Sequence, residues 1–317
     1  MSRNRSLTLY LALAILVAAP LPVTAQQRPD LEFRPLIIDP AFEIGTGPVV
    51  LIDEAHFNFH TAEGRYKPFA ELLRRDGYIV RPAATEFTEL SLAGARILVI
   101  SNALNEDDVE EWMLPNPSAF TRSEIEAVGT WVQSGGSLLL IADHMPFPGA
   151  ASELAAHFGL LFTNGYARRE GFDIEGTGGG MIFTRADGSL RPHPITNGRS
   201  VGEHIESVTT FTGQAFRAHP KTPIDPLLVM GDDVVVLLPK VAAQFTDTTP
   251  QLAAVGWFQG AVLRHGTGQV AAFGEAAMFS AQVAGAERSP MGMNAPSAEE
   301  NYQFLLNLMH WLSGLFD

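Results

Sequence analysis

The sequence contains no cysteine. This absence excludes disulfide bonds, a thiol nucleophile and lipid attachment through a cysteine. Basic residues are also scarce: 21 Lys and Arg stand against 35 Asp and Glu, for a formal net charge of -14, and they form no basic stripe. A chain this acidic repels nucleic acids and anionic lipid surfaces, so we expect no nucleic-acid partner.

Long apolar runs are nearly absent as well. The exception spans residues 7–19, follows the basic residues Arg3 and Arg5, and is followed by the small residue Ala25. This pattern predicts a secretory signal peptide, residues 1–25, cleaved after Ala25. The run is shorter than the roughly 20 residues that span a bilayer. We therefore expect a periplasmic or secreted protein with no membrane span after cleavage.

Two motifs match those of known enzyme classes, but the sequence around each motif excludes the corresponding function. Asp53 to His56 spell the DEAH box of helicases, but the chain has no GxxxxGK[ST] phosphate loop beside which that box works. Residues 198–202 match the GxSxG of serine hydrolases. Because a turn-rich loop precedes them instead of a buried strand, Ser200 is not predicted to be a nucleophile.

Short apolar runs alternate with amphipathic segments through most of the chain. Residues 26–47, rich in Pro and Gly, predict an extended N-terminal segment, and residues 48–317 predict one α/β domain. The alternation is typical of crossover units, and so of a doubly wound, mostly parallel, flavodoxin-like sheet. The predicted strands are 49–53, 78–82, 95–101 and 137–142, and the predicted helices are 66–76, one opened by the capping box at Thr121, and one beginning near Ala150.

The second half of the chain is less regular. Residues 163–230 contain many turns and no long periodic run, which predicts an irregular insertion. Strands are predicted again at 234–238, 252–258 and 269–274, the last two as a candidate pair. The apolar face of residues 297–315 predicts a C-terminal helix.

Polar side chains gather where the predicted parallel strands end. In such a sheet the ligand crevice lies outside the carboxyl ends of the strands. We therefore expect one site built from residues that follow four strands: Asp53, Glu54 and His56; Asn102; Asp143 and His144; and Glu275.

These residue types serve both as general acids and bases and as ligands for divalent cations. Glu54 or Asp143 is the candidate general base, and His144 or His56 the candidate acid. Asn102 and Glu275 are candidates for holding substrate hydroxyl groups. A divalent metal bound by Asp53, His56 and His60 is an alternative, although no HExxH motif accompanies them. A purely structural role, capping helices and tying loops, stays open.

Four segments carry a resemblance to a known family: GGSLLLIADHMPFPGAASELAAHFG, HPITNG, GEAAMFSAQ and NYQFLLNLMHWL. Over residues 48–315 the chain resembles the class I glutamine amidotransferase-like superfamily. More narrowly, it resembles an exported bacterial branch, a domain-of-unknown-function group akin to trehalose-utilisation and intraflagellar-transport amidotransferase-like domains.

The resemblance implies the fold and the position of the pocket. True amidotransferases place a catalytic cysteine after the strand that residues 137–142 match, where this chain has Asp143 and His144. Glutaminase activity is therefore excluded. The resemblance also implies that the HPITNG loop lies near the pocket, with His193 close to Asp143 as a substrate-binding residue.

Two functions are consistent with these observations. The first is an exported hydrolase or lyase acting on a small polar molecule, with sugars among the candidates. The second is a non-catalytic module that binds a ligand or a protein on the same scaffold. The substrate and the identity of any metal are not determined by the sequence.

Overall fold

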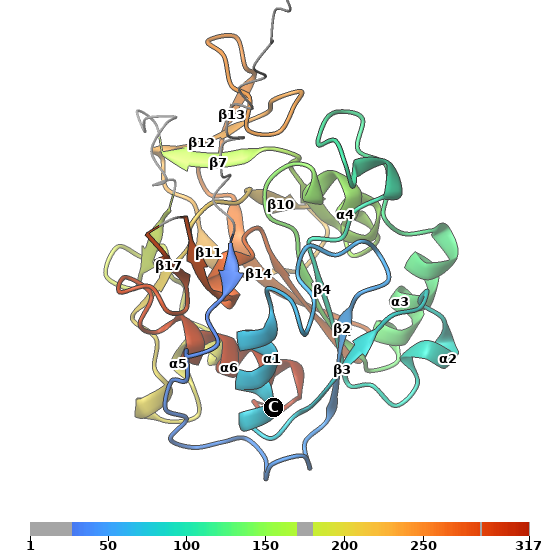
Figure 1. Cartoon of the computed structure of the whole chain (residues 1–317), viewed down its shortest axis with the longest axis vertical. Helices are drawn as coiled ribbons and strands as arrows, with labels where there is room; N and C mark the ends of the chain where they lie inside the picture. Colours follow the sequence, from blue (N-terminus) through green and yellow to red (C-terminus); the bar gives the residue numbers. More distant parts are fainter. Residues whose placement is uncertain (1–26, 170–179, 286, 317) are drawn as a thin grey trace, which may run out of the picture.

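The computed structural model describes residues 27–169, 180–285 and 287–316; the predicted signal peptide, residues 1–25, lies outside them. A central sheet of nine strands organises the molecule (Figure 1). Five strands run parallel in the order β3-β2-β4-β5-β15. They are β3 (Ile79–Ala83), β2 (Val49–Asp53), β4 (Ile97–Ser101), β5 (Ser137–Ile141) and β15 (Gly268–Phe273).

Antiparallel strands extend this sheet beyond β15. The order continues with β14, β10 and β6, and β11 also pairs with β14. These strands are β14 (Phe258–His265), β10 (Phe216–Ala218), β6 (Leu160–Phe162) and β11 (Asp225–Val229). The parallel strands at the centre are almost fully apolar, as expected for strands covered on both faces.

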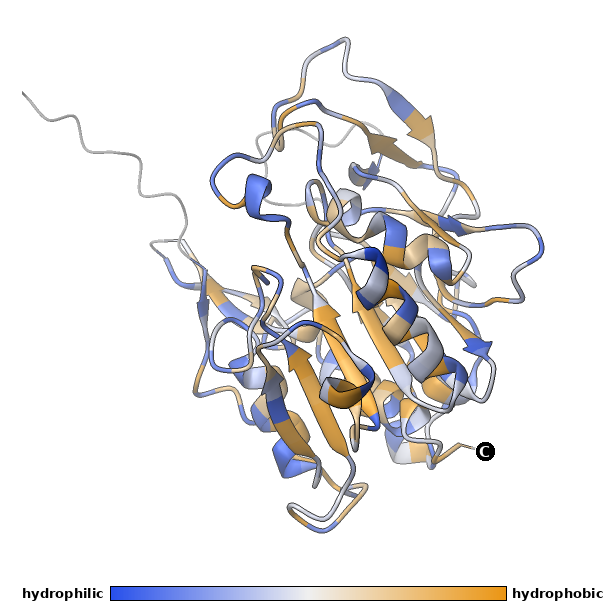
Figure 2. Cartoon of the chain, turned by 90° about the vertical axis from the view of Figure 1, so that its right-hand side faces the viewer, coloured by the Kyte–Doolittle hydropathy of each residue, from blue (hydrophilic) through white to orange (hydrophobic). Residues whose placement is uncertain are grey.

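Helices cover both faces of the parallel strands. On one face α1 (Lys67–Arg75) and α6 (Asn301–Leu312) pack against alternate strand residues such as Val99 and Leu139. On the other face α3 (Arg122–Gln133) and α4 (Phe147–His157) pack against their neighbours Leu98 and Leu138. Figure 2 shows the central strands as the most hydrophobic part of the chain, with the polar sides of helices turned outward.

Short elements complete the described part of the chain. A sheet in the order β1-β16-β17 joins β1 (Arg28–Pro29) to β16 (Ala281–Ala284) and β17 (Ser289–Gly292), and another in the order β13-β12-β7 joins β13 (Gln251–Ala253), β12 (Val234–Leu237) and β7 (Tyr166–Arg169). The remaining elements are α2 (Glu89–Leu92), η1 (Glu106–Asp108), β8 (Ile182–Thr184), α5 (Pro194–Asn197), η2 (Val201–Glu203), β9 (Ser207–Thr209) and η3 (Ala277–Phe279).

Most predicted elements are present with ends shifted by a few residues. The helix predicted from Thr121 is α3, whose capping box forms as expected: the Thr121 hydroxyl accepts from the Glu124 N–H, and the Glu124 carboxylate accepts from the Thr121 N–H. The prediction of one strand at 252–258 is wrong. A turn at Gly256, whose φ is +74, separates β13 from β14.

The consequence of that turn is a different pairing from the predicted one. β13 pairs with β12 in a side sheet, and the antiparallel partner of β15 is the later segment β14. In its described part, the region predicted as an insertion, 163–230, contains short strands, α5 and the 3-10 helix η2, and two of the strands, β10 and β11, belong to the central sheet. Residues 170–179 lie outside the described residues. Across the described ranges, no helix has the length and apolar character needed to cross a membrane.

Candidate functional site

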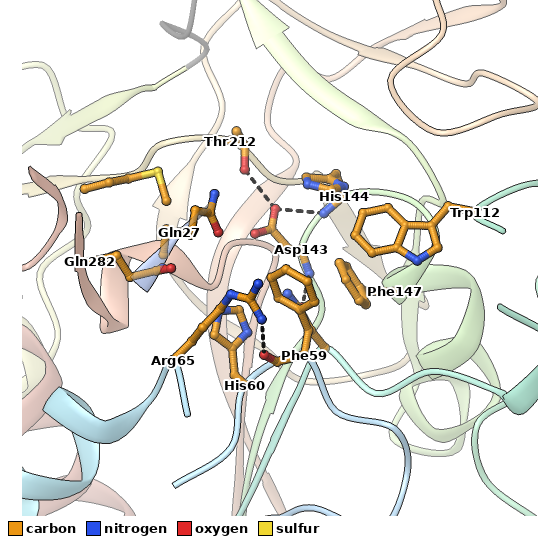
Figure 3. A pocket seen from close by; sticks show the side chains of 13 residues that line it. Gln27, Phe59, His60, Arg65, Trp112, Asp143, His144, Phe147, Thr212 and Gln282 are labelled. Atoms are coloured by element: carbon orange, nitrogen blue, oxygen red, sulfur yellow. Dashed lines mark hydrogen bonds between the residues drawn. The ribbon is translucent and has the colours of Figure 1, made fainter. Parts of the chain in front are cut away.

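A cavity of about 770 Å³ opens at the carboxyl ends of the parallel strands (Figure 3). Its walls come from strand ends, loops and the small β1-β16-β17 sheet. The residues that line the cavity include Phe59, His60, Arg65, Asn102, Trp112, Asp143, His144, Phe147, Thr212 and Gln282. Four of them, His60, Asn102, Asp143 and His144, are among the predicted site residues.

Asp143 is held in place from three directions. Its backbone N–H donates to Asn102 Oδ1 at 2.9 Å, and its Oδ1 accepts from the Thr212 hydroxyl at 3.0 Å and from the His144 N–H at 2.8 Å (Figure 3). Asn102 itself has a φ of +50, a left-handed conformation that costs a non-glycine residue energy. The carboxylate is therefore fixed at the end of β5 with Oδ2 left for another partner.

His144 has a defined tautomer. Its Nδ1 lies 2.8 Å from the carbonyl oxygen of Met145, which can only accept, so Nδ1 carries the hydrogen and Nε2 keeps a lone pair. The ring stacks on Tyr166 with centroids 4.6 Å apart and an angle of 11° between the planes. With Nδ1 protonated, Nε2 is the ring nitrogen that can accept a proton, as a general base does.

Glu275 lies near Asp143 but is not part of the cavity lining. It is fully buried and accepts hydrogen bonds from the N–H groups of Ala277 and Met278 at 2.9 and 2.7 Å. Burial raises the pKa of Glu275 well above its usual range, and the nearby charge of Asp143 raises it further. As predicted, the ends of the parallel strands bring Glu275 close to Asp143. Glu275 is fully buried, however, and does not face the cavity.

His60 and Arg65 form the wall next to β2. Burial, together with the charge of Arg65, lowers the pKa of His60 to about 3, so this imidazole is neutral at physiological pH. The guanidinium of Arg65 lies 3.7 Å from the centroid of the Phe59 ring. The cavity therefore carries one cationic wall residue, Arg65, and one carboxylate, Asp143.

Asp53 and His56 lie in a separate buried cluster. Nδ1 of His56 is 2.9 Å from Asp53 Oδ1, and Nε2 is 2.8 Å from Glu124 Oε1 on α3. The ring is enclosed by Phe87 and Phe120. With both ring nitrogens bonded to carboxylates, His56 ties the end of β2 to the start of α3 and is not available to the cavity.

The predicted metal site is not assembled. No group of three or more His, Asp or Glu side chains in the described part of the chain is arranged to hold a metal ion. Asp53 and His56 bind each other, while His60 Nδ1 lies 3.3 Å from the Ser101 hydroxyl. Glu54 is also directed elsewhere, because its Oε1 accepts from the backbone N–H of Ala62 at 2.8 Å.

His193 lies at the opposite edge of the sheet from Asp143. Its ring caps α5 and packs on Trp311, with ring centroids 5.8 Å apart. Leu312, next along α6, accepts a hydrogen bond from Ser137 at the start of β5, whereas Asp143 follows the end of that strand. At about 3.3 Å per residue, Ser137 and Asp143 are about 20 Å apart, so the predicted approach of His193 to Asp143 is wrong.

Several lining residues were not predicted. Arg65, Trp112, Thr212 and Gln282 come from loops and from the β1-β16-β17 sheet. None directly follows a strand of the parallel core. Gln282 ends the segment GEAAMFSAQ, but that segment was not used to assign it a role. The sequence holds no signal that joins them, because their meeting depends on how the loops cross the sheet edge.

Comparison with known proteins adds evidence about the fold. No protein-family model matches the chain, and no curated protein does either. Among solved structures, the mmIFT52 N-terminal domain is similar with a TM-score of 0.58 at 16% identity, over 83% of this chain and 97% of that chain. At this identity the likeness shows a shared fold and nothing about activity.

Other solved structures are less similar. A ThuA-like protein from Bacteroides uniformis has a TM-score of 0.42 at 12% identity, over 86% of this chain and 94% of that chain. A beta-galactosidase from Bacillus circulans has a TM-score of 0.41 at 11% identity, over 85% of this chain but only 31% of that chain. These scores carry no functional argument.

Proposed function

We propose that the cavity is the active site of a hydrolase or lyase that acts on a small polar substrate, with sugars among the candidates. The observation that supports this best is the pair of adjacent residues Asp143 and His144. Both line the cavity and both are oriented by hydrogen bonds. Asp143 Oδ2 and His144 Nε2 have no hydrogen-bond partner among the described residues.

The two side chains have complementary roles in this proposal. His144 Nε2 accepts a proton from water or from the substrate, and the same nitrogen returns it to the leaving group or product. Asp143 Oδ2 accepts a hydrogen bond from a substrate hydroxyl and stabilises the imidazolium that forms. Glu54 and His56 have no part in this scheme, since their side chains are bonded elsewhere.

The finer fold class and the location are part of the same proposal. The strand order β3-β2-β4-β5-β15 with helices on both faces supports a doubly wound, flavodoxin-like sheet of the amidotransferase-like kind. The basic and apolar start of the sequence supports export to the periplasm or the medium. No glutaminase is proposed, because the chain has no cysteine.

The test is a substrate screen followed by matched variants. Wild-type protein is incubated with 4-nitrophenyl glycosides, 4-nitrophenyl esters and polyuronides, and any turnover is then measured for Asp143→Asn and His144→Gln. Each variant is expected to lower kcat/KM by roughly 10²–10⁴-fold, the usual contribution of a general acid or base. Asp233→Asn, in an exposed ion pair with Arg169 away from the cavity, is the control and should change it less than about twofold.

Two results would contradict the proposal. Full activity in both site variants would remove Asp143 and His144 from the chemistry. Ligand binding without turnover, with Asp143→Asn lowering only the affinity, would instead support the alternative, a non-catalytic binding module.

A further inference from the structure

Arg65 is a partly buried cation without an acidic partner. One terminal nitrogen donates to the Phe59 carbonyl at 3.3 Å, and its Nε is buried with no partner. Nearby, Lys67 and Arg74 both pair with Glu63, at 3.0 and 3.4 Å. Within the described residues, no Asp or Glu oxygen forms an ion pair with Arg65.

This arrangement costs energy in the unliganded protein. Removing a cation from water without a counter-charge is unfavourable, and burial accordingly lowers the pKa of Arg65. The Phe59 ring offsets part of the cost through its negative face. A guanidinium held in this way presents donors that suit the two oxygens of a carboxylate.

Gln282 places an unsatisfied acceptor on the same side of the cavity. The Ser280 hydroxyl donates to the Ala277 carbonyl at 2.9 Å, so it accepts from Gln282 Nε2 at 2.6 Å. This fixes the orientation of the amide and leaves Oε1 buried without a donor. In Figure 3 the side chains of Gln282 and Arg65 both extend toward the cavity. A ligand group that donates, such as a hydroxyl, would satisfy Oε1.

An aromatic wall, formed by Phe59, Trp112 and Phe147, makes another part of the cavity. Trp112 and Phe147 pack edge to face with centroids 5.2 Å apart, and Phe59 packs on both of them (Figure 3). Surfaces of this kind bind the C–H face of a ring while leaving its polar edge free. In Figure 3 Asp143 lies between Gln282 and Trp112.

We propose that the cavity binds a sugar acid: a hydroxylated ring whose carboxylate pairs with Arg65. Its hydroxyl groups donate to Gln282 and Asp143, and its apolar face lies on the aromatic wall. This proposal rests on the proposed function in one respect, since it takes the same cavity as the substrate site and names the substrate class.

The test compares sugars that differ only at one carbon. Binding of D-glucuronate and D-galacturonate is measured by calorimetry against D-glucose and D-galactose, with wild-type protein, Arg65→Met, Arg65→Lys and the control Arg217→Met. Arg217 lies over Trp257 outside the cavity, so its replacement removes a similar cation–aromatic contact. Melting curves of each variant establish that it is folded.

The expected pattern has three parts. At least one acid binds about tenfold or more tightly than its neutral counterpart, as a charged hydrogen-bonded pair requires. Arg65→Met removes that advantage and changes neutral-sugar affinity less than about twofold, while Arg65→Lys keeps part of it. Arg217→Met has no effect on either sugar.

Other patterns overturn the proposal. These are equal binding of acid and neutral sugar, no binding of either acid, or equal weakening of both sugars by Arg65→Met. Because the readout is affinity, such a failure leaves the catalytic roles of Asp143 and His144 to be judged separately by their turnover. Conversely, if Asp143 and His144 prove not to be catalytic, the preference for sugar acids over neutral sugars can still be measured by binding.

Discussion

The side-chain oxygen of Asn102 accepts a hydrogen bond from the backbone N–H of Asp143 at 2.9 Å, joining the ends of β4 and β5. Asn102 adopts a φ of +50 in doing so, and its own N–H bonds to the Ile141 carbonyl at 3.0 Å. An unfavourable backbone conformation is thus retained where it directs the carboxylate of the proposed site.

Substitutions at Asn102 should separate backbone conformation from hydrogen bonding. Asn102→Ala loses the bond and keeps a β-carbon in the left-handed region, so the free energy of unfolding should fall by about 1–3 kcal/mol. Asn102→Gly also loses the bond but tolerates the conformation, and should lose less. Urea denaturation measures both. If the glycine variant is the less stable of the two, the backbone strain inferred here is wrong.

The Asp143→Asn variant should become more stable relative to the wild-type protein as the pH rises. The folded-state pKa of Glu275 lies above its usual 4.5, so the stability that Glu275 contributes is present below pH 4.5 and is lost as the pH rises toward the folded-state value. Removing the Asp143 charge reduces this loss. The stability of the variant relative to wild type should therefore be higher at pH 8 than at pH 4. Chemical denaturation at both pH values tests this, and a pH-independent difference would contradict it.

The His56 cluster should make stability fall above neutral pH. Burial alone lowers the pKa of His56, but the hydrogen bonds and charges of Asp53 and Glu124 outweigh it and raise the pKa above 6.5. The stabilisation is then complete below pH 6.5 and is lost as the pH rises through the folded-state pKa. The carboxylate of Glu124 has a lowered pKa, because hydrogen bonds from Thr121, Phe87 and His56 outweigh its burial, so its contribution is lost in acid.

His56→Leu should therefore cost about 3–5 kcal/mol near pH 6, because two buried carboxylates lose their cation. The difference from wild type should shrink as the pH rises through the folded-state pKa of His56, where the wild-type imidazole loses its proton. Unfolding curves across this pH range provide the measurement. A cost that stays constant with pH would mean that His56 does not change its protonation state over this range.

Trp112→Ala should weaken binding of acid and neutral sugars alike. The ring contributes apolar contact and carries no charge, so we expect about a fivefold loss for each, equivalent to about 1 kcal/mol. This contrasts with Arg65→Met, which should affect the acids alone. Trp257→Ala, outside the cavity, is the matched control. Loss of binding for the acids only would place Trp112 in contact with the carboxylate instead.

The parallel core was predictable because its strands are buried on both faces. Such strands appear in the sequence as short apolar runs, and the polar residue after each run marks the edge where ligands bind. Asn102, Asp143 and His144 were found in this way. The turn at Gly256 was missed because the apolar residues on both sides of it continue without interruption.

The errors at the site have a common cause. The residue after a strand is placed by the sheet, but the direction of its side chain depends on partners that are distant in sequence. Glu124, 68 residues from His56, draws that imidazole into the core. Similarly, His193 caps the short helix α5 and packs on α6, which no local pattern indicates.

The strand pairing of β1 with β16 has a practical consequence for experiments. Arg28 and Pro29 are paired with Val283 and Gln282, and Gln27 lines the cavity. Any sequence fused directly ahead of Gln27 is therefore attached at the wall of the binding site. An affinity tag for ligand studies belongs after α6, which ends beside the start of β5 at the far edge of the sheet.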